Sequence, residues 1–253
     1  MLKERCKLTE KSLFRRKGSL GKTFYYPAGT SETQAEEWGR CLALCRQEQV
    51  FPTRKHRAVS VVSCGNRRFI VKRHLLWRRP SRYRRHYSEA VREIVSHQEF
   101  SRHCDMALPQ LYCCVEKSFF GIPYEWVMVM EYLDNYREIE PQETGLISDV
   151  LELMFRRGYY HPDFKHGNFL VSKEDKSFSL IDLDMCRTVE KCSFDHLVLH
   201  ICRYIYDRLH VHGIRKVLSL DKPAEELIEK VYSKIAPAMS PEDFRELILS
   251  KIS

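Results

Sequence analysis

The chain has 253 residues, of which 43% are hydrophobic and 30% are charged, and its net charge is +8. This length and composition fit one two-lobed domain or two small ones with a real core, and they exclude a disordered tail. The sequence contains no run of about 18 apolar residues that could span a membrane, and its basic N-terminus lacks the apolar segment of a secretory signal.

The ten cysteines are scattered, and no two of them form a Cys-x-x-Cys pair. We therefore expect reduced thiols and a cytoplasmic location. One group resembles a zinc site, and it consists of Cys192, His196, His200 and Cys202. The alternative is an amphipathic helix whose His and Cys side chains pack in the core or at the surface. We favour the helix because the paired ligand spacing of zinc sites is missing.

The first third of the chain predicts strands and one main helix. Residues 1–55 hold polar, helix-compatible stretches with turn signals, and we assign them to an N-terminal extension or to the start of a first lobe. Residues 58–62 and 68–72 are rich in β-branched residues and flank a Gly65-Asn66 turn, which predicts a β-hairpin. A first lobe of residues 56–133 would begin with this hairpin.

A basic stretch follows the hairpin, with nine Lys or Arg residues between Arg67 and His86. Such a patch favours an anionic partner, and the alternative is a solvated helix face with a loop. Ser81 can cap a helix that runs to about His103. Two strand-like runs, residues 111–115 and 126–130, complete the lobe.

The pattern changes after residue 133. A polar linker over residues 134–142 leads to a helix over residues 146–157, which ends at Gly158. Two short apolar strands, residues 169–171 and 178–181, are joined by a charged turn, and the remainder is helical. The sequence therefore predicts an α+β fold with a small β-rich N-lobe and a larger, mostly helical C-lobe over residues 134–253.

A catalytic pattern lies at the start of the second lobe. His161-Pro162-Asp163, followed five residues later by Asn168, matches the H-x-D-x-x-x-x-N catalytic loop of kinases. Phosphoryl transfer requires the acceptor hydroxyl, the metal ions and the phosphates to be held in line. Asp163 would accept the proton of the acceptor hydroxyl, Asn168 would bind a metal ion, and Lys165 would reach the transferred phosphate.

Asp182 is the second acid of this predicted site. It follows an apolar strand, fourteen residues after Asn168, and a short hairpin between them would bring the two together. A carboxylate there would bind the Mg²⁺ ion that bridges the phosphates. The alternative is that both motifs are ordinary turns. The occurrence of all these features in the right chain order argues against that alternative.

The first lobe supplies candidates for nucleotide binding. Lys72 ends a strand where a kinase places its phosphate-binding lysine. Glu93, in the following helix, is the first choice for the carboxylate that orients Lys72, with Glu89 as the alternative and Glu99 as a third candidate. Glu131 lies in the segment 130–133, which would form a hinge whose backbone contacts adenine; an ordinary strand end is the alternative.

Two features depart from the pattern of regulated protein kinases. The chain has no Gly-x-Gly-x-x-Gly before the first hairpin, so residues 52–57 would have to cover the phosphates. Pro162 replaces the usual Arg, and Asp182-Leu183-Asp184 replaces Asp-Phe-Gly. We therefore do not expect activation through a phosphorylated loop.

The chain resembles the bacterial lipopolysaccharide core kinases, which have a protein-kinase-like fold and phosphorylate heptose or Kdo sugars. The resemblance covers roughly residues 58–205, and its motifs are VKRH, RRPSRYRRHYSEAVREI, HPDFKHGNFLV and LIDLDMC. It implies an ATP- and Mg²⁺-dependent sugar kinase at the cytosolic face of the inner membrane. The residues that it assigns to this activity are Lys72, Glu93, Asp163, Asn168 and Asp182.

The expected partner is a lipid-linked or phosphorylated sugar. An anionic membrane surface could bind the arginines of the basic stretch, which are Arg78, Arg79, Arg82, Arg84 and Arg85. No nucleic-acid partner is expected, because no recognised binding motif is present. Two alternatives stay open: another small-molecule or protein kinase, such as an aminoglycoside-phosphotransferase-like enzyme, and a pseudokinase that binds anionic lipid.

Overall fold

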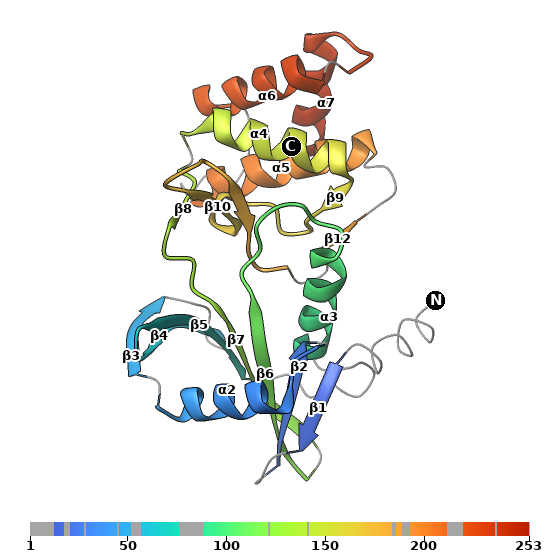
Figure 1. Cartoon of the computed structure of the whole chain (residues 1–253). Coiled ribbons are helices and arrows are strands. Elements are labelled where there is room, and N and C mark those ends of the chain that lie inside the picture. The colour runs from blue at the N-terminus through green and yellow to red at the C-terminus, as the bar shows by residue number, and fades with distance from the viewer. Residues whose placement is uncertain are drawn as a thin grey trace. The chain divides into compact units, whose positions relative to one another are not determined.

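The computed structural model describes residues 13–17, 21–27, 29–44, 46–51, 57–75, 89–120, 122–140, 142–183, 186–188, 193–211, 220–235 and 237–252. The chain forms two compact units (Figure 1). The first unit comprises Met1–Glu99 and Pro109–Asp134, and the second comprises Phe100–Leu108 and Asn135–Ser253.

The first unit is built on a seven-stranded antiparallel sheet in the order β1-β2-β6-β7-β5-β4-β3. Its strands are β1 (Leu13–Lys17), β2 (Lys22–Pro27), β3 (Arg46–Phe51), β4 (Arg57–Cys64), β5 (Arg67–Leu75), β6 (Leu111–Phe119) and β7 (Ile122–Glu131). The predicted hairpin is confirmed as β4 and β5. Gly65 lies in its turn with φ +59°, a left-handed conformation that glycine adopts without strain.

Helices pack on both faces of this sheet. Helix α3 (Glu89–Ser101) places the buried Ile94 against one face, where it packs with Cys114 and Met128. Helix α2 (Glu32–Leu44) places Ala35 against the opposite face, beside Phe69. Because side chains alternate along a strand, Lys72 shares the α3 face with Ile70, which packs in the α3 cluster.

Helix α2 begins with a capping box that the sequence contains but that we did not predict. The N–H of Gln34 donates to Ser31 Oγ at 3.2 Å, and the N–H of Ser31 donates to Gln34 Oε1 at 2.9 Å. The predicted helix start at Ser81 lies outside the described residues, and α3 is described from Glu89.

The second unit combines helices with two small sheets. Its helices are α4 (Thr144–Arg157), α5 (Phe194–Val211), α6 (Lys222–Ile235) and α7 (Pro241–Ile252). One sheet has the order β11-β10-β8 and the other pairs β12 with β9. Their strands are β8 (Tyr136–Glu138), β9 (Tyr159–Tyr160), β10 (Phe169–Ser172), β11 (Phe178–Leu180) and β12 (Arg187–Thr188).

The predicted stop of α4 is confirmed. Gly158 has φ +69°, and its N–H points to the carbonyls of Met154 and Phe155, as in a left-handed helix cap. The predicted linker differs from the structure, because its residues Tyr136–Glu138 form β8 and pair with β10.

One hydrophobic core joins the helices and the strands of the second unit. It includes Leu151 of α4, Ile201 of α5, Leu227 of α6 and Phe244 of α7, each at most 1% exposed. Phe169 of β10 is buried in the same core. The core therefore holds the helices and the short strands as one body, which fixes the loop before β10. Within the described part of the chain, no helix has the length and apolar character needed to cross a membrane.

Candidate active site

The segment between β9 and β10 carries the H-x-D-x-x-x-x-N motif and ends in the short helix η2 (His166–Asn168). Phe164 is 1% exposed, and its ring lies 4.3 Å from the ring of Phe169 and 5.1 Å from that of His200, measured between centroids. Phe164 therefore fixes the segment to the core, while the neighbouring Asp163 is exposed and Lys165 is half-buried.

Three of the predicted catalytic residues lie in direct contact. Lys165 Nζ lies 2.6 Å from Asp163 Oδ2. Asn168 Nδ2 donates to the Asp163 carbonyl at 2.8 Å and to Asp163 Oδ2 at 3.2 Å. These bonds use the amide nitrogen, so Oδ1 is the Asn168 atom that can coordinate a cation. The arrangement places a carboxylate, an ammonium group and an amide oxygen within one small cluster.

Asp182 follows β11 directly beside this cluster. The N–H of Ile181 donates to the Asn168 carbonyl at 3.0 Å. This bond holds the backbone before Asp182 against the end of residues 161–168, the catalytic segment. Asp182 has φ +60°. Asp tolerates this left-handed conformation better than most residues, and such conformations are frequent at functional sites.

His161 joins the catalytic segment to the strand end before Asp182. The ring is fully buried, its Nε2–H donates to the Ile181 carbonyl at 3.1 Å, and its Nδ1 accepts from the N–H of Asp163 at 3.2 Å. Burial is the main cause that lowers the pKa of His161; the positive charge of Lys165 adds to this, and Asp182 and Asp163 oppose it. The neutral imidazole therefore links the backbone at Asp163 to the backbone at Ile181, just before Asp182.

His200 of α5 supports His161 from the core. Its Nε2 accepts the backbone N–H of His161 at 3.3 Å, and its ring stacks on those of Phe164 and Tyr160. Burial, above all, and the neighbouring His161 lower the pKa of His200 to about 3. Sequence reasoning did not assign this role, because no local motif connects His200 to a residue 39 positions earlier.

The zinc site, the alternative that the sequence disfavoured, has no support among the described residues. No group of three or more His, Cys, Asp or Glu side chains there could hold a metal ion. His200 and Cys202 are buried in the core of the second unit, and His196 bonds to Ser193. Cys192 lies outside the described residues.

We predict that His200 makes the protein less stable in acid. Its pKa is about 3 in the folded protein and about 6.5 when unfolded, so the unfolded state takes up the proton first as the pH falls. Between these two values, the free energy of unfolding should fall by about 1.4 kcal/mol per pH unit from this group. Urea unfolding at several pH values from 7.5 to 5 measures this slope.

The variant His200→Gln keeps a hydrogen-bond acceptor but cannot take up this proton, so its stability should depend less on pH. Between pH 7.5 and 5 the variant should lose about 2 kcal/mol less of its unfolding free energy than the unmodified protein. His103→Gln, at an exposed position, is the matched control and should leave the slope unchanged. An identical slope for His200→Gln and the unmodified protein would refute this role of His200.

The first unit holds the predicted phosphate-binding lysine. Lys72 of β5 pairs with Val59 of β4 and Met128 of β7. Burial lowers the pKa of His97 in α3, and the positive charge of Lys72 contributes to the shift. The Lys72 ammonium group therefore lies within electrostatic reach of the α3 face that carries His97.

This placement bears on the choice of the partner of Lys72. Glu93 lies one helical turn before His97, on the same face of α3, whereas Glu99 points to a different side. The side chains of Glu93 and Glu89 lie outside the described part of the structure. Glu93 therefore stays a prediction, and helical spacing favours it over Glu99.

Glu131, at the end of β7, is bonded within the first unit. Its N–H donates to the Gln110 carbonyl at 2.8 Å, and its carboxylate accepts the Gln110 N–H at 2.9 Å. Arg68 lies over the ring of Tyr132 at 4.5 Å from its centroid and forms an ion pair with Asp134. The N–H of Glu131 is thus engaged, and the adenine contact of the segment 130–133 stays a prediction.

The structure brings Asp163, Lys165, Asn168 and Asp182 together in the second unit, and it places Lys72 and Glu131 in the first. Of residues 52–57, which are proposed to cover the phosphates, 52–56 lie outside the described part of the chain and Arg57 begins β4. The arginine cluster at 78–85 lies outside it as well.

Comparison with known proteins bears on the fold. No family model matches the sequence, and no match is found among curated proteins. The structure is similar to that of WaaP, which was solved in complex with acyl carrier protein. The TM-score is 0.51 at 15% sequence identity, over 85% of this chain and 91% of WaaP. The chain has a protein-kinase-like fold. The predicted α+β class is thereby confirmed.

A second similar structure is the kinase PK-1 of Cydia pomonella granulovirus. The TM-score is 0.43 at 12% identity, over 87% of this chain and 100% of PK-1.

Proposed function

We propose that this protein is a phosphotransferase that moves the γ-phosphoryl group of ATP to a sugar hydroxyl of the lipopolysaccharide inner core. The observation on which the proposal rests is the cluster of Asp163, Lys165 and Asn168, with the backbone before Asp182 bonded to it. A carboxylate, an ammonium group and metal-binding oxygens are the parts that phosphoryl transfer needs from a protein.

Each residue of the cluster has a chemical role in this proposal. The Asp163 carboxylate is exposed and would accept the proton of the acceptor hydroxyl. The Lys165 ammonium group, 2.6 Å from that carboxylate, would bind an oxygen of the transferred phosphoryl group and offset its charge. His161 and His200 would hold Asp163 in place without changing their own charge.

The residues present fit a Mg²⁺ ion that arrives with a nucleotide. Asn168 offers Oδ1 and Asp182 offers a carboxylate, and Mg²⁺ is commonly bound by one or two protein ligands with phosphate and water completing its shell. The ion supplies positive charge that neutralises the phosphates. Lys72 would bind the phosphates from the first unit, with Glu93 orienting it, and the backbone of residues 130–133 would contact adenine.

The acceptor class rests on the sequence motifs, with the kinase-like fold as support. The stretches HPDFKHGNFLV and LIDLDMC resemble those of lipopolysaccharide core kinases, and heptose and Kdo are the acceptors that this resemblance implies. The proposed location is cytoplasmic, at the cytosolic face of the inner membrane. The basic stretch with Arg78, Arg79, Arg82, Arg84 and Arg85 would attract a phosphorylated, lipid-linked acceptor.

A substrate panel tests this proposal. The protein is incubated with γ-labelled ATP and Mg²⁺ against inner-core oligosaccharides, aminoglycosides and generic protein substrates. We expect the label in a heptose or Kdo residue, and none when EDTA removes Mg²⁺. Label in an aminoglycoside or in protein would refute the acceptor class, and no transfer to any acceptor would favour the pseudokinase alternative.

A further inference from the structure

The hairpin between β6 and β7 carries an apolar tip. Phe119 of β6 pairs with Ile122 of β7, and Phe120 lies in the turn between them. The exposed fractions are 69% for Phe119, 91% for Phe120 and 66% for Ile122. The two phenylalanine rings contact each other edge to face, with centroids 4.5 Å apart. Large apolar side chains gathered on one exposed tip typically mark a surface that binds an apolar partner.

Phe120 adopts a backbone conformation that is unfavourable for a bulky residue. Its φ is +48°, in the left-handed region that Gly, Asn and Asp adopt more easily than a bulky residue. The turn could therefore form with less backbone strain if Gly, Asn or Asp stood at this position. Its aromatic side chain is not needed for the core, because it is almost fully exposed. A strained, exposed aromatic residue is a reason to look for function.

The base of this tip is firmly held. The N–H and the hydroxyl of Ser118 both donate to the Gly21 carbonyl, at 2.8 and 3.0 Å. Gly21 has φ +70°, and a side chain at this position would collide with the Ser118 carbonyl oxygen. The turn before β2 thus braces the end of β6, so the apolar tip is presented on a fixed support.

Positive charges lie directly behind the tip. Lys22 of β2 and Lys117 of β6 are cross-strand neighbours, an unfavourable pairing of like charges unless an anion lies nearby. Lys117 and Arg73 both pair with the buried Glu125, at 2.8 and 3.1 Å. Two cations thus share one carboxylate, and Lys22 adds a third positive charge across the strand from Lys117, which leaves an excess of positive charge.

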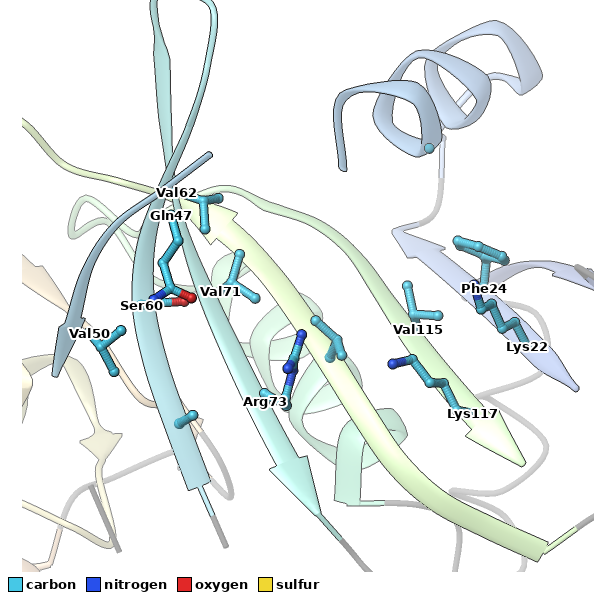
Figure 2. A pocket seen from close by; sticks show the side chains of 13 residues that line it. Lys22, Phe24, Gln47, Val50, Ser60, Val62, Val71, Arg73, Val115 and Lys117 are labelled. Carbon is cyan, nitrogen blue, oxygen red and sulfur yellow. The ribbon is translucent and has the colours of Figure 1, made fainter. Parts of the chain in front are cut away.

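The same three cations line a pocket of about 430 Å³ on the α2 face of the sheet. Figure 2 shows the side chains of Arg73 and Lys117 pointing toward one another in this pocket, with Val62 and Val71 farther along the sheet. Its positive side chains can receive a phosphate-sized anion.

The distance between the cations and the apolar tip fits a lipid bilayer. Lys117 lies two residues before Phe119 on the same strand, a separation of about 7 Å. An interfacial segment typically buries its apolar side chains about 5–10 Å into the boundary between headgroups and acyl chains. Phe119, Phe120 and Ile122 at that depth would leave Lys117 and Lys22 at the level of the lipid phosphates.

We propose that the β6–β7 tip inserts into the surface of an anionic phospholipid bilayer, with Lys22 and Lys117 binding lipid phosphates. The aromatic tip supplies apolar contact, and the lysines supply the preference for anionic lipid. This binding site differs from the basic stretch at 78–85, and it depends neither on ATP nor on the phosphoryl-transfer reaction.

Vesicle co-sedimentation of the full chain without nucleotide tests the proposal. The protein should bind vesicles of phosphatidylglycerol with phosphatidylcholine more tightly than vesicles of phosphatidylcholine alone, and added salt should weaken the binding. The double variant Phe119→Ser/Phe120→Asn should lower the partition coefficient by about tenfold or more, because two apolar side chains are lost. Lys22→Glu should weaken binding to the anionic vesicles and leave binding to neutral ones unchanged.

Matched controls separate lipid binding from damage to the fold. Phe120→Asn alone should keep or raise the thermal midpoint, because Asn adopts the left-handed conformation more easily. Leu199→Ser removes another exposed apolar side chain, 38% exposed, from α5, and Lys222→Glu repeats the charge change of Lys22→Glu on α6. Both controls should bind vesicles as the unmodified protein does.

Two results would overturn the proposal. The first is absence of binding to the anionic vesicles by the unmodified protein, which would point to a protein partner for the tip. The second is a result that does not single out the tip, either equal binding by the double variant and the unmodified protein or equal losses in the double variant and Leu199→Ser. Because the assay contains no ATP, its outcome is independent of the phosphotransferase proposal.

Discussion

Replacing Asp163 by alanine is expected to lower kcat for phosphoryl transfer by about 10²- to 10⁴-fold, the usual contribution of a general base. The variant removes the only carboxylate of the catalytic segment 161–168. The KM for ATP should change little, because the proposed nucleotide contacts come from other residues. Steady-state kinetics with the acceptor identified in the panel measures both constants.

The fold should survive this substitution. The side chain of Asp163 is exposed, and Asn168 keeps its 2.8 Å bond to the backbone carbonyl of residue 163. An unchanged thermal midpoint would show that the loss is catalytic. Glu174→Ala, in the exposed turn between β10 and β11, removes a carboxylate from the same unit and is the control. Turnover by the Asp163 variant at the unmodified rate would disprove the assignment of the base.

The cluster of Asp163, Lys165 and Asn168 could be predicted because its residues are local in sequence. The three lie within one short loop, and their spacing matches a known motif. Asp182 is brought beside them by a hairpin with three paired positions, from Phe169 opposite Leu180 to Val171 opposite Phe178. The turn and the apolar strands that form this hairpin are visible in the sequence, and they need no knowledge of the rest of the fold.

The support of the cluster could not be predicted in the same way. His200 lies on a core-facing position of α5, where an apolar side chain would produce the same helical pattern. Only packing of α5 against the catalytic segment shows that its ring accepts the N–H of His161. The bonds of Glu131 to Gln110 are likewise formed between strand ends that are 21 residues apart.

Parts of the fold also lack a local signal. Strand β3 has the sequence RQEQVF, and all of its side chains except that of Phe51 are exposed. An exposed edge strand is held mainly by backbone bonds to one neighbour, so it needs no alternation of apolar and polar residues. The same reason explains why the sequence predicts a linker where β8, an edge strand of three residues, is found.

Replacing Asp182 by asparagine is expected to weaken Mg²⁺-dependent ATP binding by about tenfold or more. Removal of one unit charge about 4 Å from a cation costs about 1–4 kcal/mol at effective dielectric constants between those of water and a protein surface, and about 1.4 kcal/mol corresponds to a factor of ten. Calorimetric titration with ATP in the presence of Mg²⁺, and again with EDTA, measures the loss. The two titrations should differ for the unmodified protein and become similar for the variant.

Asparagine is the informative replacement at this position, because it also tolerates the left-handed conformation that Asp182 adopts at φ +60°. The variant Asp182→Gly extends the argument, since glycine adopts this conformation without strain. It should retain or raise the thermal midpoint and still lose Mg²⁺-dependent binding, whereas Glu174→Gln should change neither property. If Asp182→Gly binds ATP and Mg²⁺ as the unmodified protein does, then Asp182 is a structural turn residue and the metal must be held by other groups.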